Sequence, residues 1–266
     1  MNDVSFVLEK FNPFAHTQKK EMNIDEDDCV LSISSGNMKL KNIPYISLPA
    51  AYSCPFASAC KSKVIIDEEG KKRIVDYGDY RCFSTQAEVY IPQVYANRHR
   101  NFDLLKVMKT SDEMFELINK SLIHYKQTKG TFKVFRIHSD GDFFNQLYFD
   151  AWLKVAEINP STIYYAYTKS LIYWIKRKDS IPANLKLIAS YGGRMDDLIE
   201  KENLRHCIVV KSVEEAIEKE LHIDVDDSLA FDTDINFALL LHGSQPKGSG
   251  LYDYVKKNKQ IMNKYR

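Results

Sequence analysis

The stretch TFKVFRIHSDGDFFNQLYFDAWLKVAEINPSTIYYAYTKS, residues 131–170, decides the fold class. Its apolar run at 132–137 predicts a strand, residues 147–158 predict a helix that stops at Asn159-Pro160, and 162–167 predict the next strand. The alternation continues, with further strands predicted over 185–190, 207–210, 229–231 and 237–241. This alternation is typical of βα units. We therefore expect an α/β fold, a parallel sheet of βα units arranged as a partial (β/α)6-type barrel.

Residues 47–82, SLPAAYSCPFASACKSKVIIDEEGKKRIVDYGDYRC, hold three of the five cysteines, Cys54, Cys60 and Cys82. A strand pattern over 38–47 leads into this cysteine loop. Within the loop, β-branched residues at 64–66 and 74–75 flank Glu68-Glu69-Gly70, which predicts an inserted β-hairpin. Because the two ends of a hairpin meet, Cys82 is expected to lie near Cys60. We divide the chain into an N-terminal lead-in and strand over 1–35 and a single α/β domain over 36–266.

Three thiolates in one loop predict a metal or iron–sulfur site. Thiolates are preferred ligands of iron–sulfur clusters and of zinc, and three of them leave one coordination position open. The alternative is that these cysteines are isolated and buried, as free cysteines often are. For Cys29 and Cys207, which lie in apolar strand-like runs, packing is the preferred interpretation.

Polar residues follow several predicted strands. In parallel α/β folds, ligands bind at the carboxyl ends of the strands. The alternatives are an ordinary βα turn with an aspartate as helix cap at 138–142, and a flexible connection at the glycine-rich segment 239–250. The candidate cofactor-binding residues are His138, Asp140, Gly141, Asp142, Thr168, Lys169, Ser190, Arg194 and Lys247.

The composition excludes some classes of protein. A formal net charge of +1 over 266 residues provides no overall attraction to nucleic acid or membranes. No apolar run approaches the ~20 residues that cross a bilayer, and the N-terminus lacks signal-peptide features. We therefore expect a cytoplasmic protein without a membrane partner. Basic clusters at 98–100 and 256–266 are interpreted as solvated helix faces, with nucleic-acid contacts as the alternative.

Four motifs carry a family resemblance: SLPAAYSCPFASAC, CFSTQAEVY, RIHSDGDFF and YYAYTKS. In this order, between about Gly36 and Gly250, they resemble the phage gene product 88 family. In that family the cysteine region is similar to a compact triad that ends in Cys-Tyr-Ala. Here Cys82-Phe83-Ser84 stands at the third position, displaced by the hairpin. The resemblance implies a location in a bacterial or phage-infected host cell.

The same arrangement more distantly resembles the radical S-adenosylmethionine proteins. That resemblance implies a [4Fe–4S] cluster on Cys54, Cys60 and Cys82, with S-adenosylmethionine at residues 138–142 and Ser190 near its polar groups. It also implies an electron-donor protein as partner. The C-x3-C-x2-C motif and the Gly-Gly-Glu-Pro turn of that family are absent from this chain.

Three functions are therefore expected in decreasing order. The first is an iron–sulfur protein, a radical S-adenosylmethionine-type enzyme acting on a substrate that the sequence does not identify. The second is a zinc-binding phage accessory protein, with His138 or Cys207 as fourth ligand, that binds nucleic acid or a host protein without catalysis. The third is an interaction protein in which the cysteines only pack.

Overall fold

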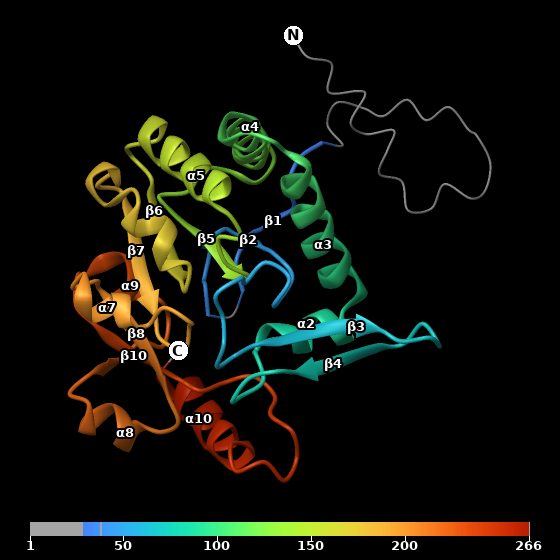
Figure 1. Cartoon of the computed structure of the whole chain (residues 1–266), viewed down its shortest axis with the longest axis vertical. Helices are drawn as coiled ribbons and strands as arrows, with labels where there is room; N and C mark the ends of the chain where they lie inside the picture. Colours follow the sequence, from blue (N-terminus) through green and yellow to red (C-terminus); the bar gives the residue numbers. More distant parts are fainter. Residues whose placement is uncertain (1–28, 38, 266) are drawn as a thin grey trace.

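A central sheet with helices packed around it organises the molecule (Figure 1). The computed structural model describes residues 29–37 and 39–265, and the statements below concern these residues. Within them the sheet has eight strands in the order β1-β2-β5-β6-β7-β8-β10-β9. The strands are β1 (Ile33–Ser34), β2 (Tyr45–Ser47), β5 (Val134–Asp140), β6 (Ile163–Thr168), β7 (Leu185–Ser190), β8 (His206–Val210), β9 (His222–Ile223) and β10 (Phe237–Leu240).

The sheet is mostly parallel. Only the short β1, at one edge, runs antiparallel to its neighbour among the described pairings. From β2 to β10 the strands follow chain order, apart from the edge strand β9. The α/β class and the parallel sheet are therefore confirmed, whereas the barrel stays a prediction.

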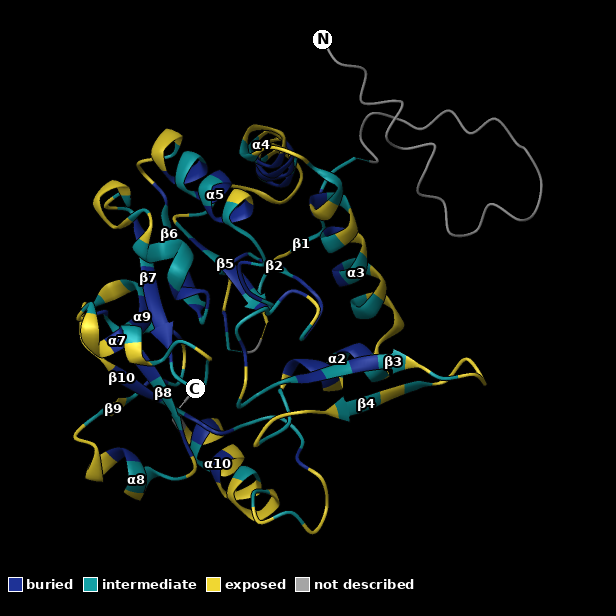
Figure 2. Ribbon diagram, in the orientation of Figure 1, coloured by how far each residue is buried: buried dark blue, intermediate teal, exposed yellow. Residues whose placement is uncertain are grey.

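The helices cover the sheet and bury its core. Helices α4 (Ser111–Lys129) and α5 (Gln146–Ile158) pack side by side over the central strands. A capping box formed by Thr110 and Glu113 opens α4. Large aromatic side chains fill the space beneath, among them the fully buried Phe135, Trp152 and Tyr164. Figure 2 shows α4 with one buried and one exposed face, and β7 buried along most of its length. The other helices are α2 (Ser84–Tyr90), α3 (Pro92–Val107), α6 (Leu171–Ile175), η2 (Lys178–Ser180), α7 (Asp197–Lys201), α8 (Val213–Glu218), α9 (Ser228–Asp232) and α10 (Tyr252–Tyr265).

The predicted hairpin is present as β3 (Ser62–Ile66) and β4 (Lys72–Asp76), which form a separate two-stranded sheet. It extends from the body of the molecule as an arm (Figure 1). Its base is closed by the Tyr77 amide, which donates to the Lys61 carbonyl at 2.6 Å, and by the Cys82 amide, which donates to Ser62 Oγ at 3.0 Å. The hairpin therefore returns the chain to the cysteine loop.

Three sequence predictions differ from the structure. Residues 229–231, predicted as a strand, lie in helix α9. The run is too short to show a period, and Asp227, at a left-handed φ of 69°, turns the chain into the helix. The strand predicted over 38–47 is only Tyr45–Ser47, because Asn42 adopts φ 61° in a turn. The third difference is the polar turn after 132–137, whose first residues, 138–140, are the end of β5 and pair with β2.

The residues 1–28 of the predicted lead-in lie outside the described part of the chain. None of the described helices is both long and apolar enough to cross a membrane.

Candidate functional site

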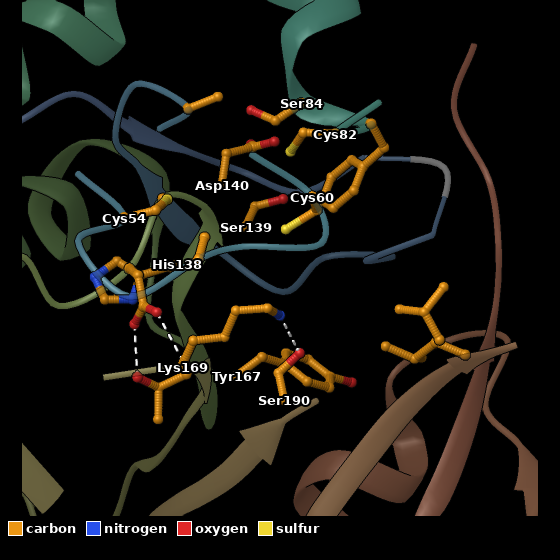
Figure 3. A pocket seen from close by; sticks show the side chains of 18 of the residues that line it. Cys54, Cys60, Cys82, Ser84, His138, Ser139, Asp140, Tyr167, Lys169 and Ser190 are labelled. Atoms are coloured by element: carbon orange, nitrogen blue, oxygen red, sulfur yellow. Dashed lines mark hydrogen bonds between the residues drawn. The ribbon is translucent and has the colours of Figure 1, made fainter. Parts of the chain in front are cut away.

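A cavity of about 140 Å³ lies at the carboxyl ends of the parallel strands (Figure 3). The cysteine loop forms one side of it, and the ends of the strands and the segment after β10 form the rest. Arg194 and Lys247 are exposed and lie outside this lining, so their assignment to a cofactor site stays a prediction. The lining includes Cys54, Cys60, Cys82, His138, Asp140, Gly141, Asp142, Thr168, Lys169 and Ser190.

The segment between Cys54 and Cys60 is anchored to the loop after β7. The amides of Ser58 and Ala59 both donate to the Gly192 carbonyl, at 3.1 and 3.0 Å, and the Arg194 amide donates to the Phe56 carbonyl at 2.9 Å. Arg194 thus serves the site through its backbone. These bonds fix the first two cysteines relative to the β7 end of the cavity.

The segment after β10 holds the third cysteine. The Gln245 side chain both donates to the Arg81 carbonyl and accepts from the Arg81 amide, each at 2.9 Å. Gly243 lies against Phe83, where a Cβ atom would approach the Phe83 Cα to 2.7 Å. Gln245 and Gly243 were not assigned this role from the sequence, although the glycines of 239–250 were a signal. Cys82 is therefore positioned by a contact with a segment about 160 residues away.

The three thiols influence one another's protonation. The Cys82 thiol donates to Cys60, which lowers the pKa of Cys60 to about 6, and the Lys169 ammonium acts in the same direction. The same hydrogen bond and burial raise the pKa of Cys82. Burial, reinforced by Asp142 and Cys60, raises the pKa of Cys54. At neutral pH the cavity therefore holds one thiolate, at Cys60, and two neutral thiols.

Arg98 connects both sides of the cysteine loop to the end of β5. Its guanidinium lies 2.6 Å from Asp140 Oδ2 and 2.9 Å from Glu88 Oε1, and it donates to Ser84 Oγ at 2.7 Å. Glu88 in turn accepts from the Ala50 amide at 2.9 Å. Arg98 is only 7% exposed, so the interpretation of 98–100 as a solvated face is wrong for this residue. A basic cluster in a sequence does not reveal a buried acidic partner far along the chain.

Asp142 joins the segment after β5 to the end of β6. Its carboxylate accepts from Thr168 Oγ1 at 2.6 Å, from the Lys169 amide at 2.8 Å and from the Phe143 amide at 2.7 Å. Burial raises the pKa of Asp142 to about 6, against these hydrogen bonds. Helix α5 is capped by Asn145, so an aspartate cap for that helix is excluded.

Two further predicted residues have clear partners. The Lys169 ammonium donates to Ser190 Oγ at 2.7 Å across the ends of β6 and β7. His138 Nε2 lies 3.2 Å from the Tyr148 hydroxyl, and burial lowers the pKa of His138 to about 3, so its ring is neutral. Gly141 lies against Leu48 and Ser53, where a Cβ atom would come within 2.7 Å of both side chains.

As the side chains stand, no group of three or more His, Cys, Asp or Glu residues among the described residues is arranged to hold a single metal ion. A tetrahedral zinc ion requires ligands that converge to about 2.0–2.3 Å from one point. The three cysteines share one cavity without meeting at one point.

These observations define a class: a mixed α/β protein with a mostly parallel sheet and a cavity at its strand ends that is lined by three cysteines. A family model described as Gene product 88 matches residues 15–262. The chain therefore belongs to the Gene product 88 family.

The chain is similar to the Gene 88 protein of Mycobacterium phage L5, with 29% identity over 139 residues. The match covers 50% of this chain and 51% of the relative, so the chain spans about half the length of that relative. No solved structure matches the chain. The family membership thus agrees with the resemblance carried by the four sequence motifs.

Proposed function

We propose that this protein binds an iron–sulfur cluster through Cys54, Cys60 and Cys82 and is an enzyme of the S-adenosylmethionine-dependent radical type. The observation that carries the proposal is that three cysteines, remote in sequence, line one cavity at the carboxyl ends of parallel strands. Three thiolates leave one iron of a [4Fe–4S] cluster free for a small-molecule ligand. An external electron-donor protein belongs to this proposal.

A cluster and a zinc ion would hold the thiols differently. In a cluster each thiolate binds a different iron, so the three sulfur atoms lie farther apart than around one ion. Zinc held by the same cysteines, in a protein that binds nucleic acid or a host protein, is the second candidate function.

The surrounding residues would prepare the thiols for this role. Metal binding requires deprotonated cysteines, so loading releases protons. Cys60 is already a thiolate, stabilised by Cys82 and Lys169. Burial keeps Cys54 and Cys82 protonated until a metal takes the place of their protons. A bound cluster would supply single electrons, and this chain would supply the enclosure and the fixed positions of the thiols.

The strand ends would hold the small-molecule cofactor. The carboxylate oxygens of Asp140 and Asp142 are bonded to Arg98, Thr168 and backbone amides. The two residues therefore shape the cavity. The Ser190 hydroxyl, which accepts from the Lys169 ammonium, lies at the β6–β7 side of the cavity and offers a polar atom to the cofactor.

Anaerobic reconstitution with iron and sulfide tests the proposal. We expect the full chain to take up about four irons and to show the visible absorption of a [4Fe–4S] cluster. Cys54→Ala, Cys60→Ala and Cys82→Ala should each lose this uptake. Cys29→Ala is the matched control, since Cys29 is half-buried and outside the cavity lining. A Cys54→Ala protein that keeps a full complement of iron would contradict the proposal, and one tightly held zinc without iron uptake would favour the second function.

A further inference from the structure

The cavity has a second side that the cysteines do not use. It is formed by the ends of β6, β8 and β10 and contributes Tyr167, Val209, Leu239 and Leu241. Val209 and Leu239 are direct partners in the parallel pairing of β8 with β10. Their side chains therefore lie side by side and form an apolar wall.

Tyr167 carries a hydroxyl group that lacks a protein partner. The atom is buried and has no hydrogen-bond partner in the described residues. The ring is held by the Arg136 guanidinium, 4.9 Å from its centroid, and by an edge contact with Phe237 at 6.1 Å. A buried hydroxyl without a partner destabilises a fold, and such groups call for an explanation. A ligand oxygen that accepts from Tyr167 would provide one.

Lys169 places a positive charge at the same side. It stands two positions after Tyr167 along β6 and its continuation, and residues two apart on a strand project to the same face. No carboxylate of the described residues lies within 4.0 Å of its ammonium, whose hydrogen-bond partner is the Ser190 hydroxyl. The charge of Lys169 is therefore not paired with a carboxylate of the described residues, and an anionic ligand would supply that pair.

We infer that this side of the cavity, the Tyr167–Lys169 subsite, binds a small carboxylic acid with an apolar body. Lys169 and Tyr167 contact the carboxylate, and Val209, Leu239 and Leu241 contact the hydrocarbon. The cavity of about 140 Å³ also contains the cysteine side, so this subsite suits only a small ligand. This inference deepens the proposed function, because it names the substrate class of the same site.

Binding of benzoate, with acetate and benzyl alcohol as comparison probes, tests the subsite. Titration calorimetry on the full chain, before and after reconstitution with iron and sulfide, should show that benzoate binds more tightly than either probe. Lys169→Met should weaken benzoate binding about tenfold or more and abolish its advantage over benzyl alcohol. Tyr167→Phe should weaken benzoate binding several-fold. Equal affinity for acetate and benzoate would overturn the inference.

A matched control and a second variant keep the test decisive. Tyr164 also carries a buried hydroxyl without a partner among the described residues, but it packs in the core outside the cavity lining. Tyr164→Phe should leave benzoate binding unchanged, and an equal loss in both tyrosine variants would overturn the inference. If Lys169→Met does not fold, Leu239→Phe offers a second test. The larger side chain fills part of the cavity beside the apolar wall and should weaken the binding of benzoate and of benzyl alcohol alike.

Two further outcomes separate this inference from the proposed function. S-adenosylmethionine should leave benzoate binding to the reconstituted protein intact, whereas competition between them would assign Lys169 to the cofactor and overturn the inference. Because benzoate binding is also measured on metal-free protein, loss of iron uptake with retained benzoate binding would contradict the proposed function alone. Iron uptake without benzoate binding would contradict the subsite alone.

Discussion

Single side chains in the cavity have charges that their neighbours determine. Cys60 is held as a thiolate by a hydrogen bond from Cys82 and by the Lys169 ammonium. His138 is held neutral by burial, which lowers its pKa below that of the free side chain. Such differences between the folded and unfolded chain make stability depend on pH.

The first prediction concerns His138. Its pKa is about 3 in the folded protein, because burial disfavours the charged ring, and about 6.5 in the unfolded chain. Between these values the unfolded chain binds a proton that the folded chain refuses, so His138 removes stability as the pH falls below about 6.5. Urea unfolding of the wild type and of His138→Gln at about pH 7, 6 and 5 measures the effect. The wild type should lose about 1 kcal/mol more per pH unit than the variant between pH 6 and 5.

The comparison of the two slopes removes the contribution of all other titrating groups that the substitution leaves alone. Identical pH dependence in both proteins would show that the pKa of His138 is the same in the folded and the unfolded chain. His138 illustrates what the sequence predicts at this scale. The sequence predicted a turn at this position, whereas His138 lies in strand β5, and its burial against Tyr148 of helix α5 depends on tertiary packing.

Among the elements, the segment after β10 has the most specific structural role, because it fastens the third cysteine. The sequence has glycines at 243, 248 and 250, which left a ligand site and a flexible connection as alternatives for this segment. In the structure Gly243 and Gly248 both have positive φ, 85° and 83°, but only Gly243 faces another segment of the described chain. The two glycines therefore form a natural comparison.

The second prediction uses this pair. Both Gly243→Ala and Gly248→Ala should cost about 1–2 kcal/mol of stability, because a Cβ atom is strained at positive φ. Gly243→Ala should cost more, since its Cβ atom would also meet the Phe83 backbone, whereas nothing lies within 4 Å of Gly248. Urea unfolding and the rate of Cys82 modification by a maleimide are the measurements. Gly243→Ala should change the Cys82 rate and Gly248→Ala should not.

Equal stability losses and unchanged Cys82 reactivity in both variants would show that the contact with Phe83 does not position the cysteine.

The hairpin β3–β4, in contrast, was predictable from the sequence. Its two strands and turn follow from local residue preferences and were predicted correctly. The contact of Gly243 with Phe83 is non-local, and no pattern along the chain encodes it.

Across the whole molecule, the network around Arg98 connects elements that are far apart in sequence. It joins the cysteine loop through Ala50 and Glu88, the start of α2 through Ser84, and β5 through Asp140. Buried ion pairs contribute little relative to an apolar replacement, but removal of one partner leaves the others buried and unpaired.

The third prediction follows from this asymmetry. Arg98→Met should lower the free energy of unfolding by about 3–5 kcal/mol, because two carboxylates lose their cation in a buried setting. Arg177→Met is the control, since the Arg177 side chain pairs with Asp150 but is 41% exposed, and should cost about 1 kcal/mol or less. Urea unfolding of both variants decides the question. Similar small losses would mean that the Arg98 network is as well solvated as a surface pair.

The architecture was predictable because alternating strands and helices leave a period in the sequence, and the strands from β5 to β8 lie where that period places them. The shared cavity of the cysteines also followed, since strand ends gather at one edge of a parallel sheet. Arg98, Glu88 and Gln245 were not predicted as parts of the site. Their roles arise from contacts between segments that only the folded chain brings together.

The closed base of the hairpin has a consequence for how relatives of this protein are recognised. Because the Tyr77 amide is hydrogen-bonded to the Lys61 carbonyl, the residues between them form an insertion whose two ends lie together. The length of this insertion can change without displacing either Cys60 or Cys82. A search that requires a fixed number of residues between the cysteines will overlook chains with the same three-dimensional arrangement. The location of the cysteines at the strand ends is therefore a better criterion for family membership than their spacing in the sequence.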